Sequence, residues 1–192
     1  MSGRERMHRK GEQGVQLARR ILESTTWIEL PFDSADNETV CTLKRLDDKD
    51  KAFDCFGFIL RERKDPLYVE AKNYDSDGGK QAADYSEFLA NAYSVTARDI
   101  EVDKLDARRE FMWFTKHPFS LNKWPDLTSE TVITDALGKH SEALDGRDID
   151  PRTLSLVSSR LWLIVAHEKQ TDLALSAEEL SRVEAMLNRK RR

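Results

Sequence analysis

The pattern of apolar and polar residues along the 192-residue chain predicts a mixture of helices and strands. Apolar residues recur at helical spacing within residues 11–23, so a first helix is predicted over about residues 5–24. Apolar or alternating runs predict strands at residues 25–32, 39–46, 53–60, 67–72, 110–117 and 161–167. Helical periodicity and capping residues predict further helices near residues 80–97, 129–144, 151–159 and 176–190.

The order of these elements predicts a single α/β domain with a mixed central sheet flanked by helices. Residues 5–117 are expected to form the core, and residues 118–192 a C-terminal extension of helices with one more strand. The polar stretch 47–51 is expected to be a turn. The continuous apolar run at 161–167 is typical of a strand in the interior of a sheet.

The amino-acid composition indicates a protein with a hydrophobic core and without disulfides or a membrane span. Hydrophobic residues make up 39% of the chain, enough for a core, and the two cysteines suit a reducing cytoplasm better than a disulfide framework. No apolar run approaches the roughly 18 residues of a membrane span, and the N-terminus lacks the apolar segment of a secretion signal. We therefore expect a cytoplasmic protein. The histidines and cysteines show no metal-ligand spacing, so no zinc site is expected.

Charge is unevenly distributed, although the net charge is only −4. Residues 1–20 carry six basic against two acidic residues, and residues 182–192 carry five against one. Basic ends of this kind suit contact with a phosphate backbone, and they equally suit solvated helix ends. The candidate nucleic-acid-binding residues are Arg4, Arg6, Arg9, Lys10, Lys80, Arg189 and Lys190.

The predicted strand at residues 67–72 carries candidate chemistry. Because side chains alternate along a strand, Glu70 and Lys72 share one face, while Ala71 faces the other way. Asp54 stands in an otherwise apolar stretch, where an acid is costly unless it is paired, hydrogen-bonded or bound to a metal. Asp54 and Glu70 together would suit Mg²⁺, which needs one or two carboxylates plus waters and a phosphate. The alternatives are an exposed Glu70–Lys72 ion pair and a hydrogen-bonded turn acid at Asp54.

This spacing, D-x15-E-x-K across neighbouring strands with a helix on either side, resembles the PD-(D/E)xK nuclease superfamily. The resemblance implies the restriction-endonuclease-like fold, with an α-β-β-β-α-β core. It also implies that Asp54, Glu70 and the Ala71 carbonyl hold Mg²⁺ or Mn²⁺, and that Lys72 positions the attacking water. Phe53 stands where the motif has proline, a position at which the family varies.

Two further features resemble the branch that contains RecB-type nucleases and archaeal junction resolvases. Glu12 is an acid in the predicted first helix, and Gln81 and Tyr85 form an i, i+4 pair in the helix that follows the ExK strand. The resemblance implies that these three residues support the catalytic site. Read on their own, Gln81 and Tyr85 suit an ordinary helix surface, and Glu12 suits a first-turn acid.

One geometric requirement accompanies this interpretation. A hairpin centred on residues 64–65 would place Asp54 opposite residues beyond Lys72. We therefore expect a bend or bulge, with Gly57 as its place, to bring Asp54 to Glu70.

The sequence thus predicts a magnesium-dependent endonuclease that hydrolyses DNA, with RNA as an open alternative. By analogy, we expect a restriction or anti-phage defence effector. The alternative is a catalytically inactive nuclease-fold subunit of a larger nucleic-acid-processing complex, and the sequence leaves open whether the chain forms a homodimer. Asp75 and Asp77 suit either a second metal ion or a solvated turn.

Overall fold

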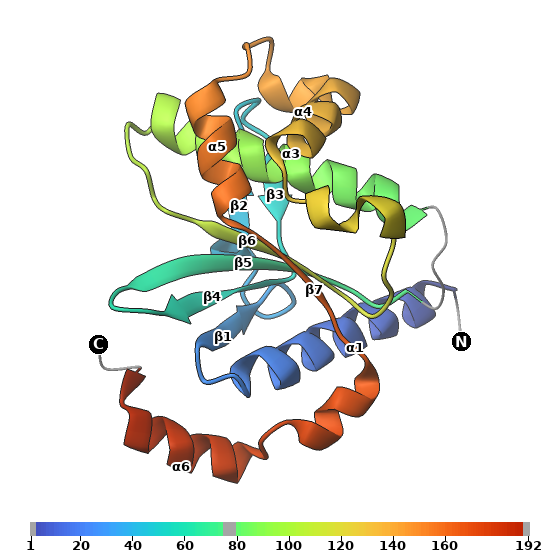
Figure 1. Ribbon diagram of the computed structural model, residues 1–192, viewed down its shortest axis with the longest axis vertical. Helices are drawn as coiled ribbons and strands as arrows, with labels where there is room; N and C mark the ends of the chain where they lie inside the picture. The colour runs from blue at the N-terminus through green and yellow to red at the C-terminus, as the bar shows by residue number, and fades with distance from the viewer. Residues whose placement is uncertain (1–2, 75–79, 190–192) are drawn as a thin grey trace.

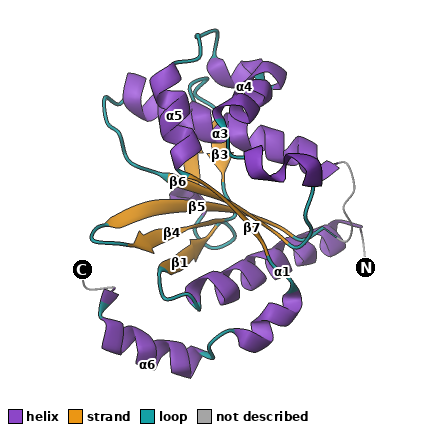
Figure 2. Cartoon of the chain, viewed as in Figure 1, coloured by secondary structure: helices purple, strands orange, loops and turns teal. Residues whose placement is uncertain are grey.

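The main sheet contains strands from the whole length of the protein. Its strands are β1 (Ile28–Asp33), β4 (Cys55–Leu60), β5 (Lys64–Lys72), β6 (Glu110–Thr115) and β7 (Leu161–Val165). The computed structural model describes residues 3–74 and 80–189 and orders these strands β1-β4-β5-β6-β7 (Figures 1 and 2). β1, β4 and β5 pair antiparallel, whereas β5, β6 and β7 pair parallel. The prediction of a mixed α/β domain is therefore confirmed.

Helices cover both faces of this sheet. The helices are α1 (Gly3–Glu23), α3 (Lys80–Glu101), α4 (Glu130–Lys139) and α5 (Pro151–Ser159). In Figure 1, α1 lies beneath the sheet and α3, α4 and α5 lie above it. Ala18 and Leu22 of α1 pack with Val69 in one apolar cluster. Phe88 of α3 packs on Trp113 in the other cluster, where the ring centroids are 5.4 Å apart. Burial of both sheet faces explains the apolar strand sequences.

The register of the β4–β5 hairpin brings the two candidate carboxylates to the same place. Cys55 pairs with Val69, and the chain turns at residues 61–63. The same register, continued by one position, sets Asp54 opposite Glu70. The expectation of a turn centred on residues 64–65 was wrong. The turn lies earlier in the chain because β5 begins at Lys64, before its apolar residues. No bulge is needed between the two strands.

Gly57 has a different role from the expected one. The β4–β5 ladder is regular through Gly57, and the irregularity lies in β1, between Glu29 and Phe32. A Cβ atom on Gly57 would lie 1.9 Å from the carbonyl oxygen of Glu29. Glycine is required here because the main chain of β1 approaches β4 too closely for any side chain.

A small hairpin is inserted between β1 and β4. The inserted segment contains α2 (Glu38–Cys41) and a two-stranded sheet of β2 (Thr42–Lys44) and β3 (Asp50–Ala52). The predicted strand at 39–46 thus begins as a helical turn and is shorter than expected. The predicted turn at 47–51 contains the start of β3. These short strands have too few alternating residues to be located from sequence.

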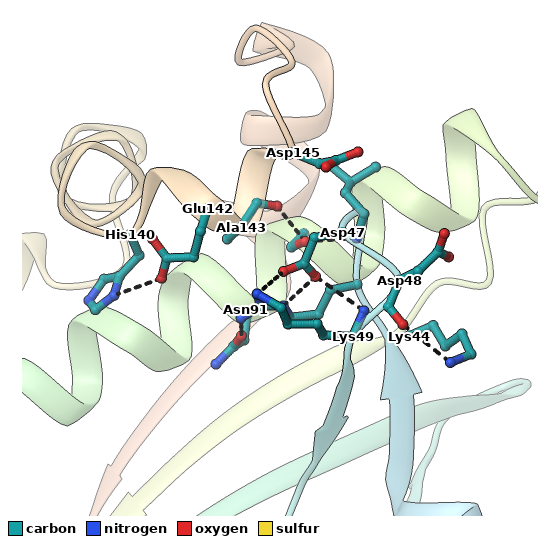
Figure 3. Close-up of polar contacts among 12 residues, drawn as sticks. Lys44, Asp47, Asp48, Lys49, Asn91, His140, Glu142, Ala143 and Asp145 are labelled. Atoms are coloured by element: carbon teal, nitrogen blue, oxygen red, sulfur yellow. Dashed lines mark hydrogen bonds and ion pairs between the residues drawn. The ribbon is translucent and has the colours of Figure 1, made fainter.

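The tip of the β2–β3 hairpin is anchored on α3. Arg45 donates a hydrogen bond to Asn91 Oδ1 at 2.8 Å, and the Leu46 N–H donates to Ser94 Oγ at 3.0 Å. Figure 3 shows this junction, in which Asp47 of the hairpin lies close to Asn91. The Ser94 hydroxyl in turn donates to a main-chain carbonyl of η2 (Ser141–Leu144). These contacts tie the hairpin to the helical layer.

The C-terminal part of the chain completes the sheet. β7 pairs with β6 at one edge, so the expectation of an interior strand at 161–167 was wrong. Trp162 of this edge strand is 37% exposed, whereas Phe111, Trp113 and Phe114 of the interior strand β6 are fully buried.

The predicted helix at 129–144 is divided into α4 and η2. The remaining elements are η1 (Leu121–Asp126), η3 (Glu168–Leu173) and α6 (Ala177–Leu187). In the described part of the chain, no helix combines the length and apolarity that a bilayer crossing needs.

Candidate functional site

Asp54 is held against the end of β5. Its Oδ2 accepts a hydrogen bond from the Ala71 N–H at 2.8 Å, and its carbonyl accepts one from the Ser34 N–H at 3.0 Å. The residue directly precedes β4, so the hairpin register and these two bonds together fix its place. The structure therefore brings Asp54 beside Glu70, as the candidate metal site requires.

Glu70 lies between two lysines. Lys72 Nζ is 2.7 Å from Glu70 Oε1, and Lys51 Nζ of β3 is 3.0 Å from Glu70 Oε2. Glu70 is only 7% exposed, so the alternative of an exposed ion pair is wrong. Lys72 also lies over the Trp113 ring, 5.7 Å from its centroid, where the negative face of the ring favours the ammonium group.

The electrostatics of the site follow from burial and from the two neighbouring carboxylates. Burial and the charge of Glu70 raise the pKa of Asp54 to about 6, against the opposing influence of Lys72, the Ala71 N–H and Lys51. Burial lowers the pKa of Lys72, but Glu70 and Asp54 outweigh it and hold that pKa above its usual value. Lys72 thus keeps its positive charge at neutral pH, whereas the ionised Asp54 is unfavourable unless a cation approaches.

The Ala71 carbonyl lies close to α1. A Cβ atom on Gly14 of α1 would lie 3.5 Å from the Ala71 carbonyl oxygen and 3.3 Å from the Asn73 Cβ. Glycine at this position lets the helix approach the end of β5 closely. The helix and the strand that carry the sequence motifs therefore meet at the site.

Glu12 shares a cleft with Asp54. The cleft has a volume of about 430 Å³ and lies between α1 and the end of β1. Its acidic lining residues are Glu12, Asp33, Asp36 and Asp54. Glu12 is exposed in this cleft. Its expected role in supporting catalysis stays a prediction.

Gln81 lies next to the same end of the sheet. Its Nε2 donates to Thr115 Oγ1 at 2.8 Å and to the His117 carbonyl at 2.9 Å, and Thr115 is the register partner of Lys72. Gln81 is fully buried, and its Oε1 has no hydrogen-bond partner among the described residues. The ordinary-surface alternative is therefore wrong for Gln81.

Tyr85 is a buried residue of the helical layer. Its ring packs on Trp113 and Phe119, and its hydroxyl donates to the Leu127 carbonyl at 3.0 Å. This geometry gives Tyr85 a packing role between α3 and the loop before α4. Its expected role in supporting catalysis stays a prediction.

Two of the candidate phosphate-binding residues, Lys80 and Arg189, have side chains that the structure describes. Arg189 donates to Thr26 and stacks over Trp27 at 3.6 Å, at the start of β1 and roughly 20 Å of strand away from Asp54. Arg189 is therefore not part of the candidate site. Lys80 is exposed at the start of α3. The structure does not describe the side chains of Arg4, Arg6, Arg9 and Lys10 in the first turns of α1. Lys190, Asp75 and Asp77 lie outside the described residues.

The residues present fit a hard divalent cation. Asp54, Glu70 and the Ala71 carbonyl provide oxygen ligands only, and the repulsion between the two carboxylates would be relieved by a cation. Within the described residues, no three or more histidine, cysteine or acidic side chains stand close enough together to hold a metal ion by themselves. The set thus suits Mg²⁺ or Mn²⁺, with waters and substrate completing the coordination, and does not suit zinc.

Comparison with known proteins gives no family. Neither a protein-family profile nor a curated protein matches the sequence. A solved structure of the Moraxella osloensis Cap4 SAVED/CARF-domain containing receptor aligns with 90% of the chain at 9% identity and a TM-score of 0.35. The chain spans 38% of that receptor's length. A likeness this distant carries no argument about the site.

Sequence reasoning missed Lys51. It falls in the stretch interpreted as a turn, and it lies nineteen residues before Glu70. No spacing rule links the two positions, because their contact depends on how the β2–β3 hairpin folds over the end of β5. The only local signal was a basic residue three positions before Asp54, which is common in a chain with 34% charged residues.

Proposed function

We propose that this protein is a magnesium-dependent phosphodiesterase of the PD-(D/E)xK type that acts on DNA. The observation that carries the proposal is the β4–β5 register, which sets Asp54 opposite Glu70 with Lys72 on the same strand face. The order α1, β1, β4, β5, α3, β6 supports it, because it follows the α-β-β-β-α-β order of that fold once the small inserted hairpin is left out.

The proposed roles follow from the contacts. Asp54, Glu70 and the Ala71 carbonyl would hold the cation, which when bound neutralises charge on the phosphodiester and acidifies water. Lys72 stays protonated, so it acts as a hydrogen-bond donor to the phosphodiester oxygen on which negative charge develops and not as a general base. Gln81 positions the end of β6 beside Lys72 through Thr115.

Cleavage assays with matched variants test this proposal. Supercoiled, linear and single-stranded DNA, and a single-stranded RNA, are incubated with the protein with Mg²⁺, with Mn²⁺ or with EDTA. Lys72→Met and Glu70→Gln are expected to lower DNA cleavage by about 10²- to 10³-fold while the protein stays folded. Lys64→Met is the control, because Lys64 lies at the other end of β5 and is exposed. Equal cleavage by all four proteins refutes the proposal.

The second candidate is a nuclease-fold subunit without catalytic activity. One observation favours it: both carboxylate oxygens of Glu70 are already engaged by lysines. Such a subunit would neither bind Mn²⁺ through Asp54 nor cleave any substrate. Titration of Mn²⁺ into the wild-type protein and Asp54→Asn separates the two candidates, because only the nuclease shows binding that depends on Asp54.

A further inference from the structure

A second lysine, Lys51, reaches the candidate site from outside the strands that carry the motif. It stands on β3 of the inserted hairpin, and its ammonium group lies 3.0 Å from Glu70 Oε2. The side chains of Lys51 and Glu70 are 20% and 10% exposed. Lys51 also lies 5.2 Å from the Phe53 ring centroid. A partly desolvated pair with an aromatic neighbour differs from the exposed surface pairs that contribute little.

The hairpin that carries Lys51 is fixed at its far end. The tip is held on α3 by the hydrogen bonds of Arg45 and Leu46 described above (Figure 3). Arg98 of α3 also forms an ion pair with Asp48. At its near end, the Phe53 N–H donates to the Cys41 carbonyl at 2.9 Å. Lys51 therefore projects from a braced two-stranded sheet, and its position beside Glu70 is set by the fold.

The two lysines are not equivalent. Lys72 lies two residues from Glu70 on the same strand face, so β5 itself holds them together. Lys51 belongs to a separate sheet and uses only the end of a long, flexible side chain to reach Glu70. A cation that binds Glu70 competes with the two ammonium groups and is repelled by both, and Lys51 is the one whose departure leaves β5 unchanged.

We propose that Lys51 occupies the Glu70 oxygen that a divalent cation takes, so that metal binding at this site displaces Lys51. The inference rests on the proposed function, because it concerns the same carboxylates. With Lys51 in place, two carboxylates face two ammonium groups and the site is close to neutral. Removal of Lys51 leaves a net negative site that attracts a cation more strongly. The inserted hairpin thereby sets the metal affinity.

Direct binding of Mn²⁺ tests the inference without any cleavage assay. Mn²⁺ affinity is measured at constant pH and ionic strength by titration calorimetry, and free Mn²⁺ by electron paramagnetic resonance. Lys51→Met is expected to bind Mn²⁺ about three- to tenfold more tightly than the wild type. Lys51→Arg retains the charge and is expected to bind like the wild type. Lys44→Met is the matched control, since Lys44 stands on β2 of the same sheet and pairs with the exposed Asp50 at 2.9 Å.

The possible results separate this inference from the proposed function. Tighter binding in Lys51→Met but not in Lys44→Met supports the displacement. If the wild type binds Mn²⁺ and Lys51→Met binds it equally or more weakly, the inference is overturned while the metal site stands. If neither protein binds Mn²⁺, the proposed metal site is overturned and the inference with it. Thermal unfolding of each variant shows whether it is folded during the titration.

Discussion

Replacement of Asp54 by asparagine is expected to stabilise the metal-free protein at neutral pH. The substitution preserves the size of the side chain and an oxygen that accepts the Ala71 N–H, but it removes the negative charge beside Glu70. Burial and Glu70 raise the pKa of Asp54 from 3.8 to about 6, so the folded state favours the protonated carboxyl. A residue that would bind a cation thus destabilises the fold when the cation is absent.

The size and direction of the effect follow from linkage. Because the folded pKa lies above the unfolded value, the stability that protonation contributes is fully present below about pH 3.8 and is lost as the pH rises through about 6. At about 1.4 kcal/mol for each pH unit between these values, ionised Asp54 lowers the free energy of unfolding by about 3 kcal/mol above pH 7. This figure is an upper value, since water that enters the cleft screens the charges.

The assay is urea denaturation of the wild type and Asp54→Asn between pH 4 and pH 8 in EDTA. The two proteins are expected to be equally stable near pH 4, and the variant more stable by up to about 3 kcal/mol at pH 8. Asp36→Asn is the control, because Asp36 lines the same cleft but is exposed. A difference that does not change with pH, or a variant that is less stable at pH 8, refutes the reasoning. Added Mg²⁺ is expected to stabilise the wild type selectively.

Three more substitutions test other parts of the structure. Gly57→Ala places a Cβ atom 1.9 Å from the Glu29 carbonyl oxygen, so a loss of about 3 kcal/mol or more in urea denaturation is expected, and an unchanged midpoint contradicts the close approach. Tyr85→Phe removes one buried hydrogen bond, so the free energy of unfolding is expected to fall by about 1 kcal/mol while DNA cleavage is unaffected. A large loss of cleavage at unchanged stability would instead give Tyr85 a role in the site. The Arg45 guanidinium holds the pKa of Asp47 well below its usual value. Asp47→Asn is therefore expected to lower the free energy of unfolding by about 1 to 3 kcal/mol at pH 7. The difference in stability from the wild type closes as the pH falls below about 4, because Asp47 of the unfolded chain then becomes protonated.

Local signals in the sequence located most of the elements. The helix predicted at 151–159 begins at Pro151, with the Asp150 carboxylate accepting the Thr153 N–H at 2.8 Å. The last helix opens with the predicted Ser176–Glu179 capping box. These signals work because a helix start depends on residues within one turn of each other.

Pairing between strands was predicted less well. Pro66 stands just before the predicted strand at 67–72, but it is the third residue of β5. Proline is tolerated there because the ladder with β6 begins only at Leu67. The position of the turn depends on which strands pair with one another. That position in turn sets the register that places Asp54 opposite Glu70. An apolar run likewise does not show whether a further strand lies beside it, so β7 was misplaced in the interior, although its Trp162 is 37% exposed.

The sequence by itself determined the mixed α/β class, the ExK strand and the pairing of Glu70 with Lys72, because strand alternation is a local property. Only the tertiary structure decided that Asp54 reaches the same point without a bulge, that Gln81 donates to Thr115, the register partner of Lys72, and that Lys51 holds the second oxygen of Glu70. Each of these contacts joins residues at least 16 positions apart, and their distances are set by the packing of sheet, helix and inserted hairpin.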